Sequence, residues 1–235
     1  MDPVIFTPRL KLILVAKAER GSPEFEWLHQ LHSNEKTTWW SIHGQAKSIE
    51  DTEKISRGYL PTQEVEAGQP KTYRVAYTVH RILETNASSV DSKLPAAECG
   101  ENATEFIGLI TLKSLDSSNL ALPENLTLPF AAATTTLTVE LAYMFLPRAW
   151  GQGYATESLE AVFTSCKRAR SFWTPFSKLY VRAIVNEGNP ASLRVMDKSG
   201  MTERGVYVLT GRTVFLAGEW RDRHSLHIFG MHLIE

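Results

Sequence analysis

The sequence predicts one α/β domain, on three observations. Segments with the residue pattern of strands and segments with that of helices are mixed along the whole chain. No internal repeat and no linker-like stretch divides them. The 235 residues, of which 43% are hydrophobic, are enough for one large globular core. We therefore treat residues 1–235 as a single domain.

The centre of the chain has the pattern of a strand, a glycine loop and a helix. Val139–Leu146 is an apolar, β-prone run, and Pro147 cannot continue a hydrogen-bonded ladder. Gly151 and Gly153 fall in the loop that follows. From Ala155 apolar residues recur at helical spacing, with acids early and bases late. Because this order directs free backbone N–H groups and the positive end of a helix at one point, it predicts a site for a phosphate or pyrophosphate.

Composition and charge exclude several classes of protein. The 25 Lys and Arg residues balance 26 Asp and Glu residues, for a net charge of -1, which does not suit a nucleic-acid partner. Cys99 and Cys166 lack the spacing of metal ligands, so we expect no metal site, no disulfide framework and a reducing compartment. The N-terminus lacks the pattern of a signal peptide, and no stretch approaches the roughly 18 apolar residues of a membrane helix. We expect a cytoplasmic protein with no membrane partner.

Before the centre, the sequence predicts a strand, two capped helices and a pair of strands. Leu10–Val15 is apolar and β-branched enough for the first strand. Ser22 followed by Pro23, and Ser48 followed three residues later by Asp51, are typical helix starts. The strand pair is expected at Tyr73–Leu83 and Phe106–Leu112.

Two connections are longer than is usual within a compact domain. Residues 84–105 are rich in Ser, Ala, Asn and Glu, so we expect an exposed, mobile insertion there. Residues 116–134 carry enough apolar side chains to pack, and we expect this second insertion to cover a face of the site. Trp39 and Trp40 lie between the two capped helices and either line a pocket or pack under those helices. We favour packing.

After the central helix, Leu179–Val185 has the alternation of a strand, and a turn at 186–190 leads into a short helix, Ala191–Ser199, which Gly200 stops. The closing strands are expected at Val206–Leu209 and Arg223–Leu233.

Motifs in this half of the chain resemble those of the GCN5-related N-acetyltransferases (GNAT). Between a strand and a helix stands Arg148-x-x-Gly151-x-Gly153. Further on come Asn189-Pro-Ala-Ser192 and then Lys198-Ser-Gly200-Met201. The opening Thr7-Pro-Arg9-Leu10-Lys-Leu12 is similar to the first strand of the ribosomal-protein-alanine-acetyltransferase-like (RimJ/RimL-type) branch. The resemblance covers most of the chain except the two insertions.

The resemblance implies a mixed, largely antiparallel sheet flanked by helices, with two central strands that splay apart. It implies acetyl-CoA as the acetyl donor, with the pantetheine arm in the gap between those strands and no metal. A Rossmann nucleotide-binding loop fits less well, since its third glycine position is Thr156 here. The implied cofactor-binding residues are Met144, Phe145 and Leu146 at the strand edge, Arg148, Gly151, Gln152, Gly153, Tyr154, Ala155 and Thr156 around the pyrophosphate, and Asn189 and Ser192 near the thioester.

Two of these residues have a second interpretation. Asn189 precedes Pro190, so it can equally serve as a turn and cap residue, and the two roles do not exclude each other. Ser192 can be a hydroxyl on the helix surface without a further role.

Acetyl transfer requires an amine to lose a proton, attack the acetyl carbonyl and expel a thiolate. Glu140 is the first candidate for the base, because an acid in an apolar strand is partly buried; the alternative is a carboxylate that points to solvent. Ser192 is the candidate acid for the thiolate, and Tyr143 and Tyr154 are its substitutes.

The sequence therefore predicts transfer of an acetyl group from acetyl-CoA to a primary amine by direct attack in a ternary complex. The acceptor is a small-molecule amine or a protein N-terminus, and the protein is a monomer or a homodimer. Two other readings remain open: a module that binds acyl-CoA without turnover, and a nicotinamide-dependent oxidoreductase.

Overall fold

Eight strands form one sheet in the computed structural model, which describes residues 1–61, 71–83 and 103–235. The strand order is β1-β2-β3-β4-β5-β6-β8-β7, and only β5 and β6 pair in parallel. The strands are β1 (Val4–Phe6), β2 (Leu10–Leu14), β3 (Arg74–Ile82), β4 (Thr104–Ser114), β5 (Thr136–Phe145), β6 (Lys178–Asn186), β7 (Thr202–Leu216) and β8 (Glu219–Ile234).

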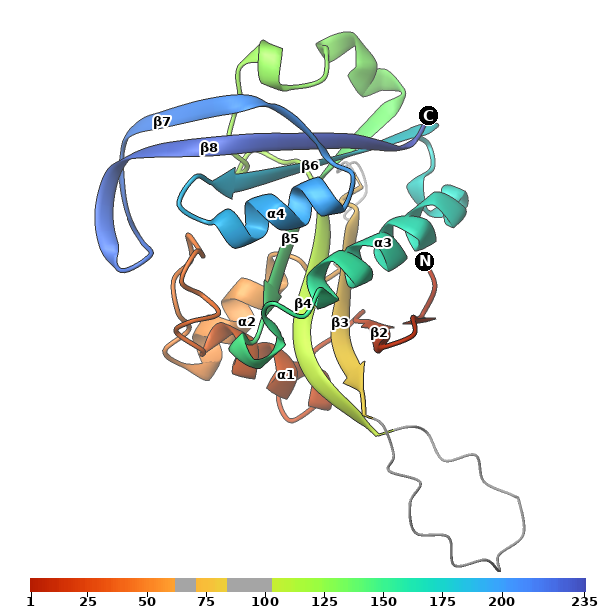
Figure 1. Ribbon diagram of the computed structural model, residues 1–235. Coiled ribbons are helices and arrows are strands. Elements are labelled where there is room, and N and C mark those ends of the chain that lie inside the picture. Colours follow the sequence, from red (N-terminus) through yellow and green to blue (C-terminus); the bar gives the residue numbers. More distant parts are fainter. Residues whose placement is uncertain (62–70, 84–102) are drawn as a thin grey trace, which may run out of the picture.

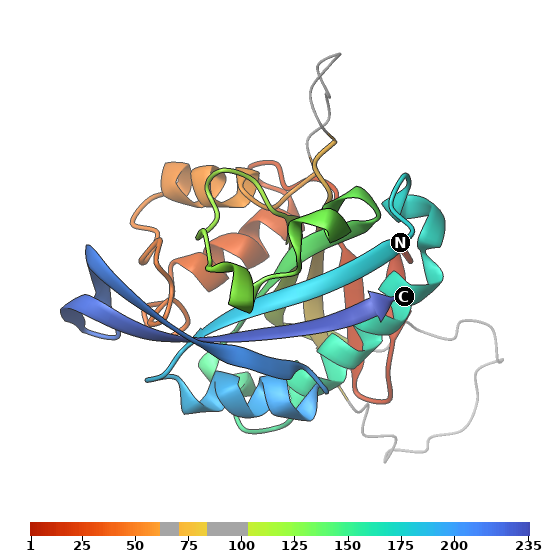
Figure 2. The ribbon, with the colours of Figure 1, turned by 90° about the horizontal axis from the view of Figure 1, so that it is seen from above.

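Helices cover both faces of the sheet. The α-helices are α1 (Pro23–His32), α2 (Ile49–Arg57), α3 (Tyr154–Arg168) and α4 (Pro190–Lys198). The short 3₁₀ helices are η1 (Glu124–Leu126), η2 (Phe130–Thr134), η3 (Pro147–Ala149) and η4 (Arg170–Trp173). In Figure 1, α3 and α4 lie in front of the sheet, and Figure 2 shows α1 and α2 on the opposite face. The predicted fold class, a mixed and largely antiparallel sheet flanked by helices, is confirmed.

The two predicted helix starts before the centre are confirmed. Ser22 caps α1 by accepting the Phe25 N–H at 3.2 Å. Ser48 and Asp51 form a complete capping box at the start of α2, in which each side chain accepts the backbone N–H of the other residue. These local hydrogen bonds need no tertiary partner, which explains why sequence alone located them.

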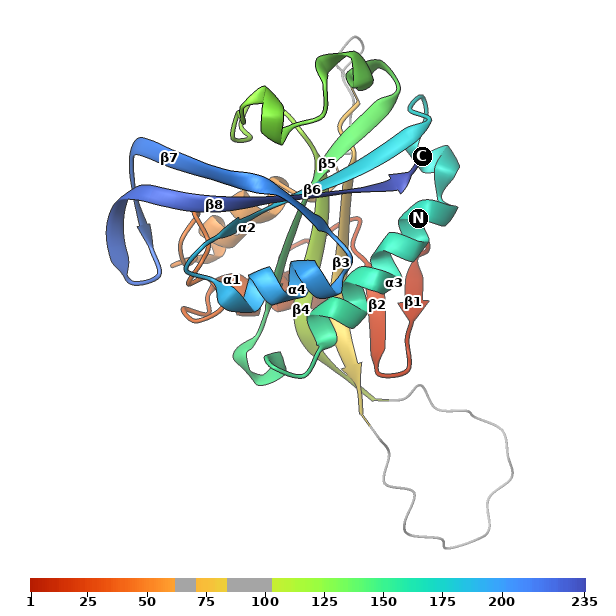
Figure 3. The ribbon, with the colours of Figure 1, turned by 45° about the horizontal axis from the view of Figure 1, so that its top comes forward.

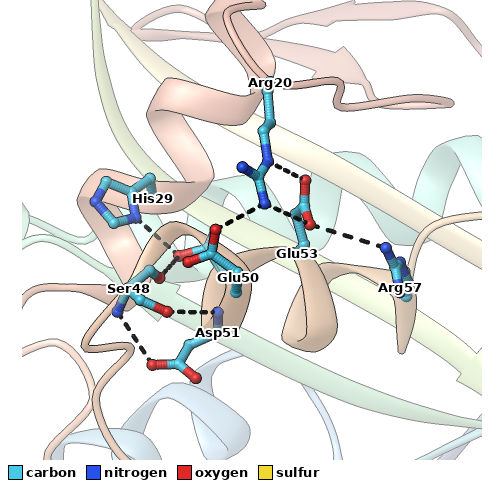
Figure 4. A network of polar contacts seen from close by, with 8 residues as sticks. Arg20, His29, Ser48, Glu50, Asp51, Glu53 and Arg57 are labelled. Carbon is cyan, nitrogen blue, oxygen red and sulfur yellow. Dashed lines mark hydrogen bonds and ion pairs between the residues drawn. The ribbon is translucent and has the colours of Figure 1, made fainter.

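A polar network then fixes α2 against α1 and the segment before it (Figure 4). Arg20 pairs with Glu50 at 3.0 Å and with Glu53 at 2.5 Å, both on α2. His29 of α1 contacts the hydroxyl of buried Thr52 at 2.8 Å. These contacts hold α2 against α1 and so fix both ends of the connection between them, residues 33–48.

The closing strands are much longer than predicted. The structure extends Val206–Leu209 to a strand of 15 residues, and β8 has 16. Figure 3 shows this β7–β8 hairpin projecting beyond the rest of the sheet. Its apolar residues alternate with exposed polar ones and with Gly205 and Gly211, so no continuous apolar run marked its length in the sequence.

The first strand and the first insertion also differ from what the sequence predicted. β1 was not predicted, because three residues are too short for a periodic signal. The first insertion, residues 84–105, lies outside the described residues except at its end, where Thr104 and Glu105 belong to β4 and pair with β3. No helix in the described parts of the chain is long and apolar enough to cross a membrane.

Gly108 of β4 lies tightly against β5. A Cβ built there would stand 2.5 Å from the Phe145 ring and 2.7 Å from the Met144 carbonyl oxygen, which belongs to the backbone and cannot rotate away. Gly108 therefore lets the two strands approach closely at the point where β5 ends.

We expect Gly108→Ala to lower the free energy of unfolding by about 1–3 kcal/mol, because β4 and β5 must separate to admit the methyl group. Urea denaturation followed by circular dichroism measures this. Val206→Ala is the control, since its side chain is 47% exposed and its loss should change stability by no more than about 0.5 kcal/mol. Equal stability of Gly108→Ala and the wild type would contradict the expected clash.

Candidate active site

The central feature of the site is the divergence of β5 from β6. The two strands pair in parallel only from Thr136 opposite Lys178 to Glu140 opposite Arg182. Beyond that point β5 pairs with β4 alone and β6 with β8 alone. Figure 1 shows the two strands running apart, with α3 and α4 over the opening. The last five residues of β5 therefore face β6 without a ladder.

Backbone groups of Tyr143 and Phe145 form the free edge of β5. The Leu146 N–H is bound by the Ile107 carbonyl of β4 at 2.8 Å, and the Met144 carbonyl also faces β4. Because successive residues of a strand offer their backbone groups to opposite neighbours, those of Tyr143 and Phe145 face the opening. Of the three residues implied for this edge, only Phe145 stands on it. Its carbonyl is already occupied by the Trp150 indole N–H at 2.7 Å, so only its N–H remains for a ligand.

The loop after β5 is shaped by two glycines in the left-handed region. Gly151 has φ 73° and Gly153 has φ 79°, conformations that other residues rarely adopt. Gly153 caps α3, whose first hydrogen bond runs from the Glu157 N–H to the Gly153 carbonyl at 3.1 Å. The N–H groups of Tyr154, Ala155 and Thr156 precede that bond and have no acceptor within the helix. The loop thus has the donors and the helix end that an anion requires.

Side chains of the loop brace it from the β4 side. Arg148 donates to the Phe106 carbonyl at 2.6 Å and pairs with Glu105 at 2.7 Å, so its guanidinium already has partners in β4. Gln152 donates through its side chain to the Arg148 carbonyl at 2.7 Å. Both residues hold the loop in shape, and their backbone N–H groups remain candidates for the anion.

Arg9, which lies just before β2, also braces this loop, and the sequence motifs did not assign it that role. Its Nη1 donates to the Gln152 carbonyl at 3.0 Å, and its guanidinium lies 4.7 Å from the centre of the Tyr154 ring. It also pairs with Glu157 at 2.5 Å. Arg9 and Gln152 are 143 positions apart in the chain, so no local pattern could reveal their contact. The only signal was the similarity of the Thr7–Leu12 segment to the first strand of a known family.

Tyr143 and Ser192 meet on the face of the sheet that α3 and α4 cover. The Tyr143 hydroxyl is buried and has no hydrogen-bond partner among the described residues. Burial raises the pKa of Tyr143 to about 12, and the Ser192 hydroxyl lies near enough to oppose part of this rise, although not in hydrogen-bond geometry. Asn189 accepts the Ser192 N–H at 3.2 Å and so caps α4, which confirms its predicted cap role.

Glu140 points to the opposite face of the sheet. One oxygen accepts Nε and Nη2 of Arg182 at 2.9 and 2.7 Å, and the other accepts the Asn119 amide at 3.2 Å. Arg182 also donates to the Leu120 carbonyl at 3.3 Å. The Glu140 side chain is 28% exposed, and that of Arg182 only 7%. Glu140 is thus neither a solvent-directed carboxylate nor a free one, because a buried guanidinium holds it where the strands part.

The second insertion covers this same face. Asn119 and Leu120 belong to it, and Leu126 packs against Gly205 of β7. Figure 2 shows the segment over β6, on the side of α1 and α2. The structure therefore places residues 116–134 beside the ion pair of Glu140 and Arg182.

Trp39 and Trp40, for which the sequence favoured packing under the first helices, contact the β7–β8 hairpin and the turn after β6. The Trp39 carbonyl accepts the Ala217 N–H at 2.9 Å, and its ring lies against Gly218 at the tip of the β7–β8 hairpin. The Trp40 ring lies against Gly188, in the turn after β6. The two tryptophans join the connection between α1 and α2 to the hairpin, and so build one wall beside the open end of β6.

Comparison with known proteins shows the family. The model of the acetyltransferase (GNAT) domain matches residues 19–202, which is most of the chain. The chain therefore belongs to the GNAT acetyltransferases. No group of three or more His, Cys, Asp or Glu residues in the described part of the chain is arranged to hold a metal ion.

Individual relatives are distant. A curated relative from Bacillus subtilis (strain 168), the uncharacterized protein YkkB, is 38% identical over 63 residues. These are 27% of this chain, and they span about a third (33%) of that protein's length.

Two solved structures share the fold over nearly the whole chain. A spermidine N-acetyltransferase from Vibrio cholerae, in complex with CoA and spermine, is 15% identical with a TM-score of 0.54, over 94% of this chain and 95% of that one. An acetyltransferase from Salmonella typhimurium that modifies the N-terminal serine of ribosomal protein L7/L12 is 16% identical with a TM-score of 0.51, over 97% and 98%. At such identities the likeness shows the fold alone, and the narrower RimJ/RimL-type branch stays a prediction.

We expect Glu157 to stabilise the loop in a pH-dependent way. Partial burial alone would raise the pKa of Glu157, but hydrogen bonds from Thr7 and Arg9 outweigh it and lower this pKa below 4.5. Glu157 therefore stabilises the fold fully above about pH 4.5, and that stability is lost as the pH falls through the folded-state pKa. Glu157→Gln should be less stable than the wild type near neutral pH, and the difference should shrink below about pH 4.5.

Urea denaturation at a series of pH values measures this difference. Glu160→Gln removes an exposed carboxylate from the same helix and serves as the control, with no comparable change expected. A difference between wild type and Glu157→Gln that grows as the pH falls would have the wrong sign for this interaction.

Proposed function

We propose that the protein transfers an acetyl group from acetyl-CoA to a primary amine by direct attack in a ternary complex. The observation that carries this proposal is the opening between β5 and β6, beside a glycine loop whose N–H groups at the start of α3 have no acceptor within the helix. The exposed strand edge suits the pantetheine arm, and the start of α3 suits the pyrophosphate. Membership of the GNAT family and the CoA complex of the Vibrio cholerae relative support the choice of acetyl donor.

Residues on opposite faces of the sheet divide the chemistry in this proposal. Glu140 accepts the proton that the amine loses as its nitrogen bonds to the acetyl carbon. Its oxygen beside Asn119 does this, because the other oxygen is held by Arg182. As the bond between carbon and sulfur breaks, the Tyr143 hydroxyl donates a hydrogen bond to the sulfur, with Ser192 as a second donor. Solvent supplies the final proton to the thiolate.

A binding module without turnover is the second candidate, and one observation favours it. The Glu140 carboxylate is already engaged by Arg182, so a purely structural role in joining β5 to β6 is physically reasonable. In that case the protein binds acyl-CoA and releases no CoA to any amine.

The proposal also covers the domain organisation, the acceptor and the location of the protein. We propose that residues 1–235 act as one domain, in which the second insertion covers the side from which the amine enters. The acceptor is a small amine or a protein N-terminus; relatives of this fold act on spermidine and on a ribosomal protein. A cytoplasmic location, the absence of a nucleic-acid partner, and a monomeric or homodimeric state remain predictions from sequence.

We expect Gly153→Ala to weaken acetyl-CoA binding about tenfold. Alanine disfavours the φ of 79° that Gly153 adopts, so the loop would lose its anion-binding shape. Isothermal titration with acetyl-CoA measures the affinity. Gly211→Ala is a matched control, since Gly211 has φ 78° and lies on the distant β7. Both variants should lose similar stability, and only Gly153→Ala should lose affinity. Equal affinities would exclude the loop as the pyrophosphate site.

We expect Glu140→Gln to lower kcat about a hundredfold or more while acetyl-CoA affinity stays the same, because the amide keeps its place beside Arg182 but cannot accept a proton. Release of CoA with a panel of primary amines measures this. A wild-type rate in Glu140→Gln would remove Glu140 from the reaction. Failure of the wild type to release CoA with every amine would favour the binding module.

Tyr143→Phe provides a companion variant. It should lower kcat without changing the pH dependence between about pH 6 and pH 10, because a group with a pKa of about 12 stays protonated throughout that range. Unchanged kcat in this variant would assign the role to Ser192 or to solvent.

A further inference from the structure

A cavity of about 400 Å³ lies where β6 ends and β8 begins, apart from the glycine loop and from Glu140. Its lining includes Asn186, Glu187 and Gly188 from the turn after β6, and Arg221, Arg223 and His224 from β8. Trp40 borders it, since its ring contacts Gly188 and lies 5.9 Å from the Arg221 guanidinium.

Two side chains that line the cavity carry buried donors without acceptors. Asn186 accepts the Gly188 N–H through Oδ1 at 2.9 Å, while its Nδ2 has no partner in the described residues. Arg221 pairs through Nη2 with Glu219, and its Nε likewise has no partner there. Buried polar groups in native proteins are nearly always paired. Both unpaired donors belong to residues that line the cavity, so the lining has donor capacity that an occupant with acceptor oxygens could use.

The charge of the lining indicates which acceptor fits. Arg223 is exposed and forms no ion pair within the described ranges, so its charge is available beside that of Arg221. Glu187 is the one acid of the lining. His224 is buried and contacts the Arg221 carbonyl at 3.2 Å, which fixes the strand that carries both arginines. An anion with two oxygens matches guanidinium donors in number and geometry.

A single turn connects the cavity with the proposed thioester site. The Asn189 N–H donates to the Asn186 carbonyl at 2.9 Å, which closes a four-residue turn. The Cα atoms of such a turn's ends lie within about 7 Å of each other. Asn186 belongs to the cavity, and Asn189 caps α4 above Ser192. The cavity thus lies beside the cap of α4, and a small acceptor with its amine at the proposed thioester site would extend toward it.

We propose that this cavity binds a carboxylate of the acceptor, so that the acceptor is a small amine with a carboxylate at its far end. This inference rests on the proposed acetyl transfer and specifies its substrate class. A polyamine fits poorly, because its second ammonium group would meet Arg221 and Arg223. Two probes of different length, 4-aminobutanoate and 6-aminohexanoate, each carry an amine and a carboxylate at opposite ends of a short chain.

The test compares how tightly the full chain binds different ligands in the presence of CoA. The ligands are these two amino acids, their carboxamides and spermidine. Isothermal titration should show that each carboxylate binds at least tenfold more tightly than its carboxamide, and more tightly than spermidine. Arg223→Gln and Arg221→Gln should each reduce this preference about tenfold or more. Arg170→Gln is the matched control, because it removes an exposed arginine near the other end of β6.

Equal binding of carboxylate and carboxamide would overturn the inference, as would a preference that survives in both variants. Replacing CoA with acetyl-CoA and measuring CoA release separates this outcome from failure of the proposed function. Turnover without preference for the carboxylate overturns the cavity and leaves acetyl transfer standing. Preferential binding of the carboxylate without any turnover overturns acetyl transfer and leaves the cavity standing.

Discussion

The site depends on the point at which β5 and β6 stop pairing. They form the one parallel pair in a sheet that is otherwise antiparallel in the described residues, and their shared register ends at Glu140 and Arg182. The ion pair between these residues joins the strands just before they separate. Because Arg182 is buried, breaking this pair would cost more free energy than breaking a surface ion pair. The position at which the two strands separate is therefore well defined.

The two faces of the sheet differ where β5 and β6 separate, because neighbouring side chains of β5 point in opposite directions. Tyr143 and Ser192 lie on the face covered by α3 and α4, together with the glycine loop. Glu140 and the second insertion lie on the other face. In the proposed reaction, this separation would let one substrate lie along the strand edge and the other approach from the face of α1 and α2.

The far end of the opening is built from parts that are remote in sequence. Trp39 and Trp40 connect the α1–α2 segment with the β7–β8 hairpin and with the turn after β6. The cavity beside Arg221 and Arg223 lies at this junction. Sheet and loop follow the shared fold, whereas the wall beyond them consists of side chains from connecting segments and from the hairpin. Such a wall is where related enzymes of one fold can differ in acceptor.

The sequence by itself determined the elements whose signals are local. The caps at Ser22 and Ser48, the strand that stops at Pro147 and the glycines of the loop follow from hydrogen bonds and backbone preferences within a few residues. Only the tertiary structure decided the length of the hairpin, the brace of Arg9 on the loop and the partner of Glu140. Those depend on contacts across the sheet, between residues whose separation in the chain leaves no periodic pattern to read.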